Sequence, residues 1–310
     1  MNCKTALVLG ATGGIGGETA RRLQACGWRV KALVRSAEAA GRLPGIACAV
    51  GDAMNREDII KAAEGASVIV HAVNPPGYRN WANLVLPMID NTLAAARASG
   101  ARIVLPGTVY NYGPDAFPLI AEDAPQNPRT RKGAIRVELE RRLAAAAQAG
   151  EARTLIVRAG DFFGPRAANN WFSQGMVAPG RRPRTIQDPN TPGVGHQWAY
   201  LPDVAETMVR LLEQEGLEDF ARFHMAGHWD PDGAAMIGAV VRALGAPDVR
   251  VKPLPWTLLR LAALVSETPR ELLEMRYLWK QPVRLSGARL ATRLEREPRT
   301  PLDRAVAETL

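Results

Sequence analysis

An apolar run followed by closely spaced glycines constrains the fold more than any other feature of this chain. Thr5–Leu9 is short, continuous and apolar, which is typical of a strand buried on both faces of a sheet. The run continues into Gly10-Ala11-Thr12-Gly13-Gly14-Ile15-Gly16, and a helical pattern extends from Gly14 to about Cys26. The sequence therefore predicts a strand, a tight glycine turn and a helix in immediate succession.

This arrangement is chemically suited to bind a pyrophosphate. Glycines let the backbone turn tightly and approach the phosphates, whose charge meets the positive end of the following helix. Thr12 can add a hydroxyl donor, and Ile15 is expected to pack into the sheet. A glycine-rich turn without a ligand is the alternative, but the position between a first strand and a helix favours a dinucleotide. The expected contacts come from Gly10, Thr12, Gly13, Gly14, Ile15 and Gly16.

The first half of the chain alternates short apolar runs with helical patterns. Strands are expected at residues 5–9, 29–34, 46–50, 67–72, 102–105 and 154–158. Strands separated by helices predict an α/β fold, a doubly wound parallel sheet of the Rossmann type with helices on both faces.

The alternation of strands and helices stops after Gly164-Pro165, where residues 166–196 become rich in Pro, Gly, Asn and Arg. We expect residues 1–165 to form a dinucleotide-binding Rossmann domain, to which residues 197–227 return. Residues 166–196 and 228–310 would form a smaller, mainly helical substrate-binding lobe.

The residues after the second strand indicate which dinucleotide is bound. An NAD-selective site has Asp or Glu there to accept a hydrogen bond from the ribose 2′-hydroxyl. This chain has Arg35, which would pair with a 2′-phosphate, and Ser36, which could add a hydrogen bond. The prediction is therefore NADP(H), although a solvated arginine is the alternative. Further contacts are expected after the third and fourth strands, from Asp52, Ala53, Ala72, Val73 and Asn74.

Together these features resemble the extended branch of the short-chain dehydrogenase/reductase superfamily, which includes NAD-dependent epimerases and dehydratases. Besides the glycine turn, the resemblance rests on Arg158–Pro165, His196–Ala205 and Phe223–Gly227. It implies a Ser or Thr that binds the substrate oxygen and a Tyr that transfers a proton. It also implies a Lys four residues after the Tyr, which binds the nicotinamide ribose and lowers the tyrosine pKa.

The active-site pattern of that branch is only partly present in this chain. Thr108 takes the Ser/Thr position, the alternative being a β-branched residue that ends a strand. Aligning the next helix through Val137-Glu138 places Thr130 and Ala134 at the Tyr and Lys positions, so the atypical site lacks the Tyr-x-x-x-Lys pair. Lys132 could reach the cofactor, and Tyr110 or Tyr112 could supply the phenol; a solvated Lys and tyrosines that pack a loop are the alternatives. The candidate catalytic residues are thus Thr108, Tyr112 and Lys132.

The main functional hypothesis is an NADP(H)-dependent oxidoreductase that acts on a small molecule. A sugar-nucleotide epimerase or dehydratase is the enzymatic alternative, and a non-catalytic NADP(H)-binding redox sensor or regulator is the other. Arg181, Arg182 and Arg184 are candidates to hold a phosphate or carboxylate of the substrate, and a solvated loop is the alternative.

Composition excludes several other classes. The net charge of +8 would be compatible with nucleic-acid binding. However, the basic groups are not interleaved with the aromatic residues that stack on bases, so we expect no nucleic-acid partner. No apolar run approaches the ~20 residues of a membrane helix. His224 and His228 are four residues apart, but a glycine breaks the segment, so we expect no metal site. Three widely spaced cysteines indicate no disulfide framework, and a cytoplasmic monomer or homodimer is expected.

Overall fold

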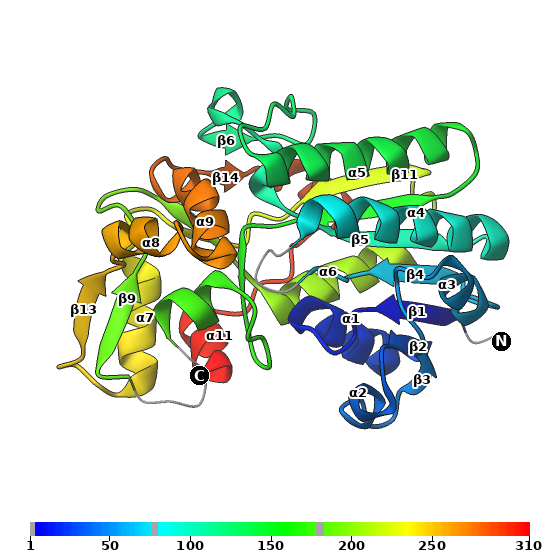
Figure 1. Cartoon of the computed structure of the whole chain (residues 1–310), viewed down its shortest axis with the longest axis horizontal. Helices are drawn as coiled ribbons and strands as arrows, with labels where there is room; N and C mark the ends of the chain where they lie inside the picture. The colour runs from blue at the N-terminus through cyan, green and yellow to red at the C-terminus, as the bar shows by residue number, and fades with distance from the viewer. Residues whose placement is uncertain (1–3, 76–79, 178–182) are drawn as a thin grey trace.

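A seven-stranded parallel sheet forms the centre of the computed structural model, which describes residues 4–75, 80–177 and 183–310 (Figure 1). The strand order is β11-β7-β5-β4-β1-β2-β3, and every neighbouring pair is parallel. The strands are β1 (Thr5–Leu9), β2 (Arg29–Val34), β3 (Ala47–Val50), β4 (Val68–His71), β5 (Arg102–Gly107), β7 (Thr154–Arg158) and β11 (Phe220–His224).

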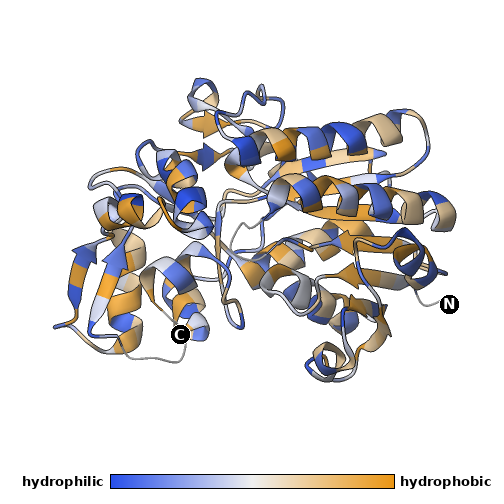
Figure 2. Ribbon diagram, in the orientation of Figure 1, coloured by the Kyte–Doolittle hydropathy of each residue, from blue (hydrophilic) through white to orange (hydrophobic). Residues whose placement is uncertain are grey.

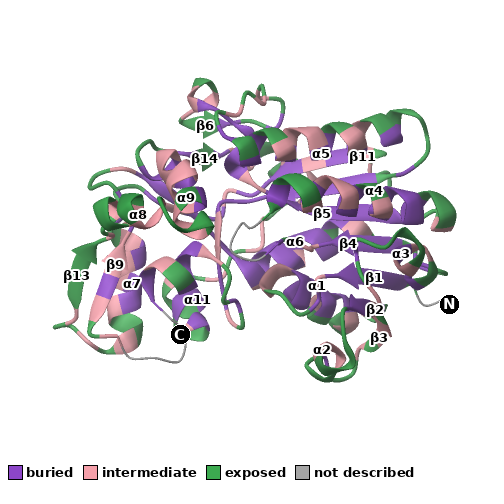
Figure 3. Cartoon of the chain, viewed as in Figure 1, coloured by how far each residue is buried: buried purple, intermediate pink, exposed green. Residues whose placement is uncertain are grey.

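Helices cover both faces of this sheet, so the central strands are apolar and buried on both sides (Figures 2 and 3). Strand β1 shows why: Leu7 and Leu9 belong to one apolar core, while Ala6 and Val8 belong to the other. The first core is completed by α3 (Arg56–Ala62), α4 (Trp81–Ser99) and α5 (Arg131–Gln148), and the second by α1 (Gly14–Ala25) and α6 (Leu201–Glu213). Helix α2 (Ala37–Gly41) connects β2 to β3.

The remaining elements lie mostly beside the carboxyl ends of the sheet (Figure 1). Three small sheets pair β12 (His228–Asp230), β10 (His196–Tyr200) and β8 (Asp161–Phe163), then β13 (Arg250–Pro253) with β9 (Thr185–Asp188), and β14 (Arg284–Leu285) with β6 (Leu119–Ile120). The helices here are α7 (Ala234–Leu244), α8 (Trp256–Ala262), α9 (Glu267–Glu274), α10 (Ala288–Leu294) and α11 (Leu302–Thr309). Short 3-10 helices occupy Val109–Asn111, Pro114–Ala116 and Met275–Trp279, and a π-helix occupies Phe172–Met176.

The fold prediction is confirmed, with one difference in detail. The sheet has a seventh strand, because β11 pairs in parallel with β7 along Phe220–His224. Asp203 lies in the first turn of α6, which begins at Leu201. The Asp203 carboxylate accepts hydrogen bonds from the Thr300 amide at 2.7 Å and the Thr300 hydroxyl at 2.8 Å. It therefore fixes the C-terminal segment to α6.

The strand order of the sheet reverses between β1 and β4, although the two strands are parallel. From β1, the strands β2 and β3 follow to one side, and β4, β5, β7 and β11 follow to the other. In open α/β sheets, ligands bind in the crevice outside the carboxyl ends of strands at such a point. The glycine turn after β1 and residues 72–74 after β4 both open onto this crevice.

Candidate functional site

The glycine turn packs closely against neighbouring backbone, which leaves no space for a side chain at Gly10 or Gly16. Gly10 has φ +87°, and a Cβ on it would lie 2.6 Å from the Ala72 carbonyl oxygen. A Cβ on Gly16 would collide with the Gly10 carbonyl oxygen. The turn is closed by the Gly13 amide, which donates to the Gly10 carbonyl at 2.9 Å, and α1 begins at Gly14. Backbone and helix N-terminus together form an open cradle of amides.

A cavity of about 1010 Å³ extends from this cradle along the carboxyl ends of β4 and β5. Seven of the predicted site residues line it together: Gly13, Gly14, Ile15, Ala72, Val73, Asn74 and Thr108. Tyr110 and Arg136 line the same cavity, and so do Asp161 and Phe162 from β8. The cavity thus joins the glycine turn to the segment after β5 and to the loop that follows β7.

Thr108 follows β5 directly and lies at the wall of this cavity. Its Oγ1 is buried and has no hydrogen-bond partner among the described residues. A buried hydroxyl without a partner costs free energy unless a ligand or water satisfies it. The Thr108 carbonyl, by contrast, accepts a hydrogen bond from Arg158 of β7. The backbone is therefore held in place while the hydroxyl is available to a ligand.

A buried polar network lies behind Thr108. The Arg158 side chain is fully buried and donates to both carboxylate oxygens of Glu140 on α5, at 2.8 and 2.7 Å. Arg158 Nε also donates to His224 Nε2 at 3.2 Å. Burial, followed by the charge of Arg158, lowers the pKa of His224 to about 3, so this imidazole is neutral. Its Nδ1–H donates to the Ile120 carbonyl, which leaves Nε2 as an acceptor.

Tyr112 belongs to this network and not to the cavity wall, which corrects our expectation of a catalytic role. It is fully buried, and its hydroxyl donates to His224 Nε2 at 3.2 Å. Burial raises its pKa, so the phenol holds its proton. Of the two tyrosines that the sequence offered, Tyr110 is the one that lines the cavity.

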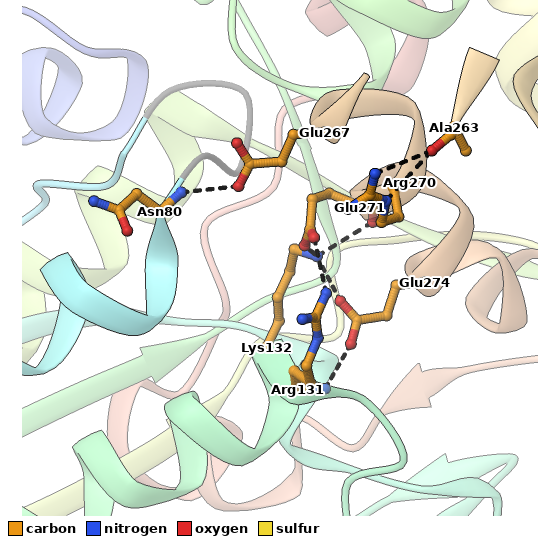
Figure 4. Close-up of polar contacts among 8 residues, drawn as sticks. All are labelled: Asn80, Arg131, Lys132, Ala263, Glu267, Arg270, Glu271 and Glu274. Carbon is orange, nitrogen blue, oxygen red and sulfur yellow. Dashed lines mark hydrogen bonds and ion pairs between the residues drawn. The ribbon is translucent and has the colours of Figure 1, made fainter. Parts of the chain in front are cut away.

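Lys132 also lies elsewhere than expected. Its ammonium group, 1% exposed, is held between Glu271 and Glu274 of α9, with Glu274 Oε2 at 2.6 Å (Figure 4). The backbone amide of Arg131 donates to Glu274, and the Arg131 side chain pairs with Glu271 at 3.0 Å. The carboxylates of α9 therefore clamp the start of α5, and Lys132 is directed toward them instead of toward the cofactor crevice.

His71 ends β4 at the floor of the cavity. Its Nδ1 lies 2.8 Å from Thr92 Oγ1, and that hydroxyl donates to the Met88 carbonyl at 3.0 Å. His71 Nδ1–H is therefore the donor, and the Nε2 lone pair remains unprotonated. Burial, together with the nearby charge of Arg136, lowers the pKa of His71 to about 3. The ring is neutral across the physiological pH range.

The other predicted cofactor contacts lie outside the cavity just described. Gly10 and Gly16 form the backbone of the turn, and Thr12 is exposed beside it. Arg35 is exposed directly after β2, and Ser36 Oγ caps α2 by accepting from the Ala39 amide at 3.2 Å.

After β3, the Asp52 carboxylate accepts from the Met54 amide at 2.9 Å, and Ala53 is buried. These positions follow neighbouring parallel strands, so they lie along one edge of the sheet.

The arginines that we predicted to hold an anionic group of the substrate are only partly described. Arg181 and Arg182 lie outside the described residues, and Arg184 lies just before β9.

Within the described ranges, no group of three or more His, Cys, Asp or Glu residues is placed to hold a metal ion. Nor does any described helix have the length and apolar character needed to cross a membrane.

Comparison with known proteins identifies the family. The sequence pattern of the NAD dependent epimerase/dehydratase family matches residues 6–221. The chain belongs to this family. An uncharacterised protein from Sinorhizobium fredii (y4nL) is 27% identical over 187 residues, which cover 53% of this chain and 52% of that protein. The chain therefore matches about half the length of this curated relative.

Solved structures of epimerases share the fold of this family member. UDP-glucose 4-epimerase from Bifidobacterium longum, in complex with NAD+ and UDP, has a TM-score of 0.76 at 16% identity, covering 99% of this chain and 97% of that one. A nucleoside-diphosphate-sugar epimerase from Pseudomonas aeruginosa has a TM-score of 0.76 at 18% identity, covering 100% and 96%. These likenesses show that the chain has the same fold as these two epimerases.

Thr130 and Ala134, which we aligned with the Tyr and Lys positions of the family, do not line the cavity. Thr130 is the N-cap of α5, accepting from the Gly133 amide at 3.0 Å, and Ala134 is exposed. Three charged residues of α5 are buried instead, Lys132, Arg136 and Glu140, spaced by four. Of these three, Arg136 lines the cavity.

Arg136 is a cavity-lining residue that the sequence interpretation missed. It is buried, and its guanidinium lies 5.1 Å from the ring centroid of Trp81. The signal for it was present in the sequence: charged residues at three successive turns of one helix face, beside the apolar Leu139 and Leu143.

Proposed function

We propose that this protein is an NADP(H)-dependent oxidoreductase of the short-chain dehydrogenase/reductase type that acts on a small molecule. The observation that carries the proposal is the buried Thr108 Oγ1, which lacks a partner in a cavity continuous with the glycine turn. A hydroxyl in that position is suited to orient a substrate oxygen. A regulatory protein that only bound a cofactor would have no need of it.

The residues present fit a dinucleotide with a 2′-phosphate. The cradle at Gly10 and Gly16 admits the pyrophosphate, and the exposed guanidinium of Arg35 can pair with the 2′-phosphate. Ser36 caps α2 through its oxygen, so its hydroxyl proton can still be donated. In this assignment residues 1–165 and 197–227 hold the cofactor, and residues 166–196 and 228–310 hold the substrate.

In the reaction, the bound cofactor supplies or accepts a hydride at its nicotinamide ring. Thr108 donates a hydrogen bond to the substrate oxygen, and the Tyr110 phenol exchanges a proton with that same oxygen. Arg136 would hold the ribose hydroxyls of the cofactor by charge-assisted hydrogen bonds, the role that the resemblance gives to the lysine. The neutral His71 offers its Nε2 lone pair as a fixed acceptor at the cavity floor.

Replacing the hydroxyl of Thr108 tests this proposal. Thr108→Val keeps the β-branched shape and removes the donor, whereas Thr108→Ser keeps the donor. With a panel of carbonyl compounds, we expect the valine variant to slow NADPH oxidation by roughly 10²-fold, the scale seen on loss of one oxyanion donor. The serine variant should retain most activity. NADPH binding without turnover of any panel member would instead favour the non-catalytic sensor.

The epimerase neighbours favour a second candidate, a sugar-nucleotide epimerase. Such an enzyme would convert UDP-glucose without net consumption of added NADPH. Incubation with UDP-glucose, followed by chromatographic separation from UDP-galactose, distinguishes the two candidates. Formation of UDP-galactose without added NADPH would replace the oxidoreductase assignment.

A further inference from the structure

A second cavity, of about 620 Å³, adjoins the cofactor crevice on the side of the substrate lobe. Asn74, Asn169, Asn170 and Trp171 line both cavities, so the two are adjacent. A ligand in the second cavity would therefore lie beside the crevice that Thr108 also lines.

The far wall of this cavity is apolar. It is formed by Leu254 after β13, Leu259 of α8 and Leu272 of α9. None of the described residues that line the cavity carries a charge. A nucleoside diphosphate carries at least two negative charges, and transferring such charges to an apolar site without cationic partners costs far more than burying a neutral group.

The amide side chains of the cavity are largely committed to their own loop. Asn170 Oδ1 caps the π-helix by accepting from the Ser173 amide at 2.7 Å. Asn169 Oδ1 accepts from Gln174 Nε2 at 2.9 Å. By contrast, Trp171 is 6% exposed, and its indole Nε1–H has no acceptor among the described residues. A ligand in this cavity would contact the apolar wall of leucines. It would also lie near the Trp171 indole N–H, a hydrogen-bond donor on a side chain that lines both cavities.

We propose that the substrate of this chain is a neutral, mainly apolar carbonyl compound or alcohol rather than a sugar nucleotide. The apolar part of the substrate occupies the pocket of Leu254, Leu259, Leu272 and Trp171. Its single polar oxygen accepts a hydrogen bond from a donor that lines the cavity, such as the Trp171 indole N–H. This inference rests on the proposed oxidoreductase function and specifies its substrate class.

The test compares two probes that differ by one charge. In equilibrium dialysis with NADP+-saturated protein, we expect 2-acetylnaphthalene to bind at least about tenfold more tightly than 6-acetyl-2-naphthoate. Leu259→Lys should lower the affinity for the neutral probe and raise that for the carboxylate. Leu264→Lys, at a residue 77% exposed and outside the cavity, should leave both affinities unchanged within about twofold.

Tighter binding of the carboxylate, tighter binding of UDP-glucose, or no binding of the neutral probe would overturn the substrate assignment. The failure of the proposed function is distinguishable from these results. Neutral-probe binding without NADPH turnover would leave the pocket assignment standing and refute the oxidoreductase. NADPH-dependent reduction of a sugar nucleotide would support the oxidoreductase function and refute the assignment of a neutral, apolar substrate.

Discussion

Lys132 and Arg136 lie one turn apart on the same buried face of α5, yet their charged groups serve different parts of the protein. The Lys132 ammonium is clamped by Glu271 and Glu274 of α9, while the Arg136 guanidinium lines the cofactor cavity beside Trp81. Lys132 therefore ties α9 to the start of α5, whereas Arg136 faces the cavity.

Arg136→Met should weaken cofactor binding. The substitution keeps an unbranched stem, shorter than that of arginine, and removes the charge that we assign to the ribose hydroxyls. A hydrogen bond to a charged group contributes about 1.5–3 kcal/mol, so we expect Kd for NADPH to rise roughly tenfold or more. Fluorescence titration measures this. Arg141→Met, on the same helix but exposed, is the control, and equal effects of both variants would argue against a site role for Arg136.

Lys132→Met should reduce stability, because it leaves the carboxylates of Glu271 and Glu274 without their buried cation. Removing one partner of a buried ion pair costs about 3–5 kcal/mol, which urea unfolding can resolve. Arg131→Met removes a neighbouring cation that contacts the same Glu271 but is 76% exposed, and should cost no more than about 1 kcal/mol. A Lys132 variant with native stability and no turnover would instead restore Lys132 as a proton-transfer residue.

Glu140→Gln should be far more destabilising than Glu138→Gln, although the two residues are two positions apart on α5. Glu140 is the bidentate partner of the fully buried Arg158, so its loss leaves an unbalanced buried cation, again at about 3–5 kcal/mol. Glu138 pairs with Arg141 and Arg142 at the surface, where such pairs contribute at most about 1 kcal/mol. Similar unfolding midpoints for the two variants would show that the Arg158–Glu140 pair contributes no more to stability than a surface ion pair.

Stability should fall as the medium is acidified below about pH 6.5. Burial lowers the pKa of His71 and His224 from 6.5 to about 3, so the unfolded chain binds protons between these values while the native protein does not. The free energy of unfolding therefore decreases as the pH falls from about 6.5 toward 3.

Urea unfolding at several pH values checks this expectation. The quantity to compare is the slope of the free energy of unfolding against pH, not its absolute value. His224→Gln removes one of the buried imidazoles whose pKa is lowered, so its slope should be smaller than that of the wild type. An unchanged slope would mean that His224 is protonated in the native state.

The sequence predicted the central sheet and the glycine turn because both are encoded locally. Continuous apolar runs such as Thr5–Leu9 belong to strands covered on both faces, and the spacing of Gly10, Gly13 and Gly16 requires a tight turn. The roles of the charged residues on α5 depend on distant partners. Lys132 is 139 positions from Glu271, and Tyr112 is 112 positions from His224. No local pattern specifies which of these side chains reaches the cavity.

A titration of the protein with NADPH and with NADH, followed by nicotinamide fluorescence, tests the central claim most directly. The account predicts an enhanced, blue-shifted emission that saturates at one cofactor per chain, with NADPH bound more tightly than NADH. Arg35→Ala should remove most of that difference, whereas Arg42→Ala, an exposed arginine paired with Glu38 on α2, should not. Equal affinity for both cofactors would contradict the Arg35 assignment, and no binding of either would contradict the account as a whole.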